Sequence, residues 1–98
     1  MSKFITYELD RPRNLRFGMK AIAMIEDSLG TKISKLDLSD IGIKDLAVFL
    51  WAGLAHEDKE LTVSKVMDLI DDYSSIQDAT DHLSHALEAC FGKPEKNV

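Results

Sequence analysis

The chain has 98 residues, of which 12 are basic and 17 are acidic, so its formal net charge is −5. This length predicts one domain with one hydrophobic core. The acidic balance argues against nucleic acid and against an anionic membrane surface as partners, and no apolar run approaches the roughly 20 residues that span a bilayer. The charged N-terminus is unlike a secretory signal, and the single cysteine, Cys90, excludes an internal disulfide. We therefore expect a cytoplasmic protein.

The first predicted element is a β-hairpin over residues 3–17. Ile5, Tyr7 and Leu9 alternate with polar or exposed positions, as in a strand with one buried side. A polar cluster that contains a proline, residues 10–14, interrupts this alternation, which then resumes in the sequence LRF. A two-stranded hairpin is marginal alone, so we expect it to pack against helices.

The first predicted helix begins at Gly18 and continues to about Leu29. Its apolar side chains recur at helical spacing, and Gly30 occupies the position of a C-terminal cap. Residues 31–39 mix apolar and charged positions, which indicates either one short helical turn or an ordered loop.

The central helix is predicted from Ile41 or Gly42 to His56, with Asp40 as its N-cap. It is apolar on both sides: one face carries Leu46, Phe49, Leu50, Gly53 and Leu54, and the other carries Val48, Trp51, Ala52 and Ala55. Two interpretations of the second face stay open. Neighbouring helices bury it, or part of it remains open as a groove or a dimer contact.

Two amphipathic helices complete the predicted domain. Thr62 caps the first, whose apolar stripe is Val63, Val66, Met67, Ile70 and Tyr73. Ser75 and Asp78 resemble a capping box for the second, which carries Ile76, Ala79, Leu83, Leu87 and either Cys90 or Phe91. Gly92 and Pro94 end this helix, and the polar tail 93–98 is expected to be frayed. The fold class is therefore mainly α: one domain, 1–98, in which a hairpin precedes a compact bundle of about four main helices over 18–91.

Histidine and carboxylate side chains offer two candidate chemical clusters. His82 and His85 lie near Asp78 and Asp81 on the last helix, but this spacing is common on solvated helices, so we expect no metal site. His56 and the two acidic residues after it are better suited to a helix end, where His56 donates to free carbonyl groups, than to acid–base catalysis. No phosphate-binding loop, zinc-protease motif or nucleophile elbow occurs. We predict no enzyme activity and no cofactor.

Two surfaces are candidates for partner binding. The first consists of Val48, Trp51, Ala55 and His56 at the second face and end of the central helix. The second is the acidic run of Asp68, Asp71 and Asp72 near the end of the following helix, where negative charge is unfavourable to the helix dipole. This run is either a solvated rim or a contact for a basic partner.

Two segments of the chain resemble the tail assembly chaperones of long-tailed bacteriophages and prophages. They read LRFGMKAIAMIEDSLG over 15–30 and LAVFLWAGLAHEDKELT over 46–62, and the likeness extends over about residues 5–91. Its more specific positions are Trp51, Gly53, Leu54, His56, Glu57, Asp58, Leu61 and Thr62.

This resemblance implies a non-enzymatic chaperone of the host cytoplasm that is absent from the mature virion. Such a protein binds the tape measure protein and helps to recruit tail tube subunits. It also implies either the short product of a frameshifted pair or a member without the extension. Apolar helix surface suits weak, multivalent binding of a helical client or self-association into a homo-oligomer. The alternative is a small dimeric adaptor or regulatory domain that self-associates through the face of Trp51 and has no phage client.

Overall fold

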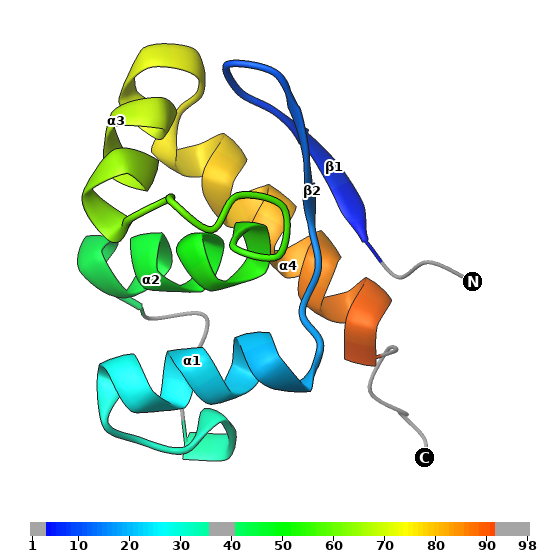
Figure 1. Ribbon diagram of the computed structural model, residues 1–98, viewed down its shortest axis with the longest axis vertical. Coiled ribbons are helices and arrows are strands. Elements are labelled where there is room, and N and C mark those ends of the chain that lie inside the picture. Colours follow the sequence, from blue (N-terminus) through cyan, green and yellow to red (C-terminus); the bar gives the residue numbers. More distant parts are fainter. Residues whose placement is uncertain (1–3, 36–40, 92–98) are drawn as a thin grey trace.

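The computed structural model describes residues 4–35 and 41–91, for positions 90 and 91 the backbone only. Its elements in chain order are β1 (Ile5–Glu8), β2 (Pro12–Leu15), α1 (Met19–Leu29), the short 3-10 helix η1 (Ile33–Lys35), α2 (Ile43–Leu54), α3 (Val63–Tyr73) and α4 (Ile76–Phe91) (Figure 1). The predicted fold class, a hairpin followed by a compact bundle of about four helices, is confirmed. The expected cap Asp40, the helix end at Gly92 and Pro94, and the tail 93–98 lie outside the described residues.

The two strands form the hairpin that the alternation predicts. They are antiparallel, with Ile5 opposite Leu15 and Glu8 opposite Pro12. Tyr7 and Leu15 are buried, whereas side chains of the opposite parity face solvent. One side of the hairpin therefore contributes to the core, as expected of a ribbon that packs on helices.

Helix α2 is the centre of the molecule. It contacts α1, α3, α4 and β2, and Figure 1 shows it between α1 and α3. Eight of its residues are buried, from both faces: Leu46, Ala47, Val48, Phe49, Leu50, Ala52, Gly53 and Leu54. The helix begins after Gly42, and it ends at Leu54 rather than at His56, because the chain turns there toward the hairpin.

The predicted caps of the other helices are confirmed. Gly30 ends α1 in the left-handed conformation with φ of 69°, which glycine adopts without strain. The Thr62 hydroxyl accepts a hydrogen bond from the Lys65 N–H at 3.1 Å, and the Ser75 hydroxyl accepts one from the Asp78 N–H at 3.1 Å.

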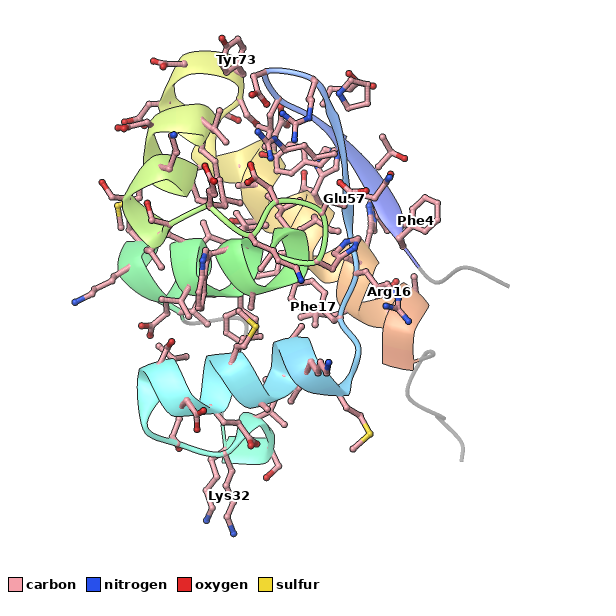
Figure 2. The ribbon with its side chains drawn as sticks, viewed as in Figure 1. Phe4, Arg16, Phe17, Lys32, Glu57 and Tyr73 are labelled. Carbon is pink, nitrogen blue, oxygen red and sulfur yellow. The ribbon has the colours of Figure 1, made fainter. Side chains whose placement is uncertain are left out.

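The apolar stripes of α3 and α4 are only partly core. Val66, Ile70 and Ala79 are buried, but Tyr73 is 56% exposed and Ile76 is 55% exposed. Both residues have the helical spacing of the predicted stripes, but they stand at the end of α3 and the beginning of α4, where they do not join the core. Figure 2 shows Tyr73 at the end of the molecule.

Candidate binding site

The turn after α2, residues 55–58, holds the hairpin against the helices through hydrogen bonds. The His56 Nε2 atom donates to the carbonyl oxygen of Asn14 at 2.7 Å. The Glu57 carboxylate accepts from the Asn14 N–H at 3.1 Å and from its side-chain amide at 2.8 Å. Burial tends to raise the pKa of Glu57, but these hydrogen bonds outweigh it and lower that pKa. The prediction that His56 donates to carbonyls of its own helix is therefore wrong, since its partner lies in β2.

A buried arginine makes a second connection between the hairpin and this turn. The Arg13 side chain is about 4% exposed, and its Nε and Nη2 atoms donate to the Asp10 carboxylate at 2.8 and 3.0 Å. Its Nη1 atom donates to Asp58 Oδ2 at 3.3 Å. The bonds from Arg13 lower the pKa of Asp10; that of Asp58 is lowered chiefly by the Glu60 N–H and then by Arg13. The cluster holds both carboxylates charged.

Arg13 was missed by the sequence analysis, which assigned it to a polar turn. A signal was present, because Arg13 has the same strand parity as Leu15 and Phe17, both of which are buried. An arginine at an inward position requires acceptors, and the two aspartates that supply them are 3 and 45 residues away in sequence.

Gly53 lets β2 and the segment after it lie directly on α2. A Cβ atom added there would be 2.7 Å from Phe17 Cζ and 3.0 Å from Leu15 Cδ2. The Arg16 N–H donates to the Gly53 carbonyl at 3.0 Å, which fixes the same contact through the backbone. Trp51 acts on the other side of the helix, where its indole N–H donates to the Leu61 carbonyl at 2.9 Å. Gly53 and Trp51 therefore hold α2 to the hairpin on one side and to the segment before α3 on the other.

The four predicted partner-binding residues have different surroundings. Val48 is 5% exposed and lies in the core, so the interpretation in which neighbouring helices bury this face is correct for Val48. Trp51 is partly buried and is held by its hydrogen bond to Leu61. Ala55 and His56 line an open groove.

The groove lies between the N-terminal half of α1 and the C-terminal end of α2, with a cavity volume of about 630 Å3. Its lining combines apolar and basic residues: Arg16, Gly18, Met19, Lys20, Ala21, Met24, Ala52, Ala55, His56 and Lys59. This lining contains no acidic residue, although the chain has a net charge of −5. Figure 2 shows Arg16 and Phe17 on the link between β2 and α1, beside the end of α2. We call this surface the basic groove.

The sequence analysis did not predict the basic groove. Its cations Arg16, Lys20 and Lys59 come from the β2–α1 link, from α1 and from the turn after α2, so no local run of basic residues announces them. Of the two methionines in the lining, Met19 is 90% exposed, whereas Met24 is partly buried against the core.

His82 of α4 contacts the hairpin and the backbone of its own helix. The His82 ring stacks on the Tyr7 ring, with centroids 4.1 Å apart, and its Nδ1 atom donates to the Asp78 carbonyl at 2.7 Å. The Tyr7 hydroxyl is 2.6 Å from the Ser74 hydroxyl, and burial raises the pKa of Tyr7. This stack joins β1 to α4. His85 is exposed.

The chain was compared with protein-family models, curated proteins and solved structures, and none of them matches it. Among residues 4–35 and 41–91, no group of three or more His, Cys, Asp or Glu side chains is arranged to hold a metal ion. No helix in that part of the chain has the length and apolar character needed to cross a membrane. A function for this chain is therefore proposed from its own residues and geometry.

Proposed function

We propose that this chain is a non-enzymatic phage tail assembly chaperone. It would bind the tape measure protein in the host cytoplasm, help to recruit tail tube subunits, and be absent from the finished virion. The observation that carries this proposal is the basic groove, an open surface of apolar and basic residues on an otherwise acidic protein. The resemblance of the α1 and α2 segments to such chaperones supplies the kind of client.

The apolar residues of the lining suit an apolar helical client. Ala55 is small and partly exposed, whereas Ala21 and Ala52 are 7% and 2% exposed, so a client would contact chiefly Ala55 and the methionines. These are Met19 and Met24, and methionine adapts its flexible side chain to different apolar surfaces. A helix that inserts apolar residues at spacings of three and four fits such a groove.

The basic residues of the groove add a charge preference. Arg16, Lys20 and Lys59 would attract acidic side chains that flank the apolar anchors of the client. One groove of this size holds a few side chains, so each contact is weak, and many copies along a long client would give the avidity. Weak individual contacts permit release when tail tube subunits displace the chaperone.

Coexpression with the candidate tape measure protein tests the proposal. We expect the wild-type chain to keep the client soluble and Lys20→Glu/Lys59→Glu to fail, because the groove then repels an acidic helix. The matched control is Lys44→Glu/Lys65→Glu, which changes the net charge equally at exposed lysines outside the groove and should work as the wild type does. A client that is equally insoluble with and without the wild-type chain would refute the proposal.

Gene order separates this function from the adaptor alternative. A tail assembly chaperone is expected between a tail tube gene and a very long tape measure gene that encodes coiled-coil segments. A gene for a small dimeric adaptor or regulatory domain is not expected between these two genes.

A further inference from the structure

We infer that the basic groove also receives the α3–α4 turn of a second copy of this chain, so that copies associate head to tail. We call this turn the acidic tip and define it by Asp71, Asp72, Tyr73 and Ile76. The inference joins two surfaces that the packing of a single copy leaves unused. It does not depend on the proposed function, because it concerns the chain alone.

The acidic tip exposes two large apolar side chains that are not packed in the core of a single copy. Tyr73 is 56% exposed and Ile76 is 55% exposed, one on each side of a two-residue turn. The groove offers apolar surface to such side chains, since Ala55 is small and partly exposed and Met19 is 90% exposed. An aromatic side chain that enters an open apolar groove is a common anchor of protein interfaces.

The charges of the two surfaces are opposite. Asp71 and Asp72 are exposed at the C-terminal end of α3, where the helix dipole disfavours negative charge. Within the described residues neither carboxylate forms an ion pair. Lys20 and Lys59 at the groove would supply the missing cations.

The positions of the two surfaces favour an open arrangement. Figure 1 shows the α3–α4 turn at one end of the long axis and α1 at the other, so a copy cannot place its tip in its own groove. Two tips would repel each other, and so would two grooves. A contact between different surfaces on identical chains does not close on itself unless the rotation forms a ring, so it generates short chains of copies. The contact is small, which makes the association weak.

Sedimentation equilibrium of the purified full chain tests this inference. We expect the average mass to rise above the 11.0 kDa of one copy as the concentration approaches the millimolar range, and to return toward that value in high salt. Three double variants are compared after circular dichroism has confirmed their fold. The groove variant is Lys20→Glu/Lys59→Glu, the tip variant is Asp71→Lys/Asp72→Lys, and the control is Lys44→Glu/Lys65→Glu.

The groove variant and the tip variant should each remain monomeric, whereas the control should associate as the wild type does. An equimolar mixture of the groove and tip variants provides a sharper result. The normal tip of the groove variant fits the normal groove of the tip variant, and the reversed tip and the reversed groove also carry opposite charges. The mixture should therefore associate again, although each variant alone does not. The control has the same net charge as the groove variant, which excludes a simple effect of total charge.

A monomeric wild-type chain overturns the inference, and so does a groove or tip variant that still associates by itself. A mixture that stays monomeric while the wild type associates overturns it as well, because association then uses other surfaces. These results are distinguishable from a failure of the proposed function. A monomeric wild-type chain that still keeps the tape measure protein soluble contradicts only the head-to-tail contact.

Discussion

Replacing Gly53 with alanine tests whether the hairpin and α2 are fitted to each other at a single point. In a solvated helix this change would stabilise the fold by about 1 kcal/mol, since alanine has the higher helix propensity. Here the added Cβ would lie 2.7 Å from Phe17 Cζ and 3.0 Å from Leu15 Cδ2. Carbon atoms prefer separations of about 3.5–4.0 Å, so at least one of the two side chains must move.

Neither neighbour has room to move into solvent. Phe17 is 2% exposed, Leu15 is fully buried, and Phe17 also packs beside Phe49 with ring centroids 6.5 Å apart. Moving the whole segment instead would stretch the hydrogen bond from the Arg16 N–H to the Gly53 carbonyl. Overpacking of a core costs about 1–3 kcal/mol, and a lost hydrogen bond costs about 1 kcal/mol more. After subtraction of the gain in helix propensity, we expect Gly53→Ala to lower the free energy of unfolding by about 1–3 kcal/mol.

Urea denaturation monitored by circular dichroism measures this change. The control is Gly42→Ala, where a Cβ meets nothing within 4 Å. Because Gly42 is the N-cap of α2, where glycine is preferred to alanine, we expect a loss of up to about 1 kcal/mol that Phe17→Leu does not change. In the background of Gly53→Ala, Phe17→Leu should cost less than it does in the wild type, because it removes the ring atom that clashes. A Gly53→Ala protein as stable as the wild type, or more stable, would show that the hairpin does not press on α2 at this point.

Three further predictions concern the links between the hairpin and the helices. Arg13→Ala removes three charge-assisted hydrogen bonds from a buried side chain and should lower the free energy of unfolding by about 2–4 kcal/mol in urea denaturation. A loss below about 0.5 kcal/mol would contradict the conclusion that Arg13 connects the hairpin to the turn after α2. The pKa values of Asp10 and Glu57 are lowered in the folded state, so their stabilisation is present above the ordinary carboxyl pKa near 4 and is lost as the pH falls through the lowered values. The urea midpoint should therefore be constant above about pH 5 and decrease below about pH 4. The decrease should be less steep in Asp10→Asn, and an equally steep decrease in that variant would show that Asp10 does not contribute to the pH dependence of stability. Tyr7→Phe keeps the ring stack but removes the bond to Ser74, and thermal unfolding should show a loss of about 0.5–1.5 kcal/mol, whereas no loss would mean that water replaces the bond without cost.

The basic groove shows why the candidate site was harder to predict than the fold. The pattern of α2 correctly indicated a helix that needs cover on both faces, but it did not reveal which part of the second face stays open. Val48 is buried and Ala55 lines the groove, although both belong to the same predicted face. The two residues differ in which other element packs against them. A helical wheel shows only the positions on one helix and carries no information about the elements around it.

The sequence by itself determined the local structure of this protein. The hairpin alternation, the glycine cap at Gly30 and the hydroxyl caps at Thr62 and Ser75 depend on residues within a few positions of one another, so their physical causes are visible in a short window. Only the tertiary structure decided that Arg13 is buried, that His56 bonds to a strand, and that three separate cations surround one groove. Each of these depends on contacts between residues distant in sequence, which the packing of the whole core brings together.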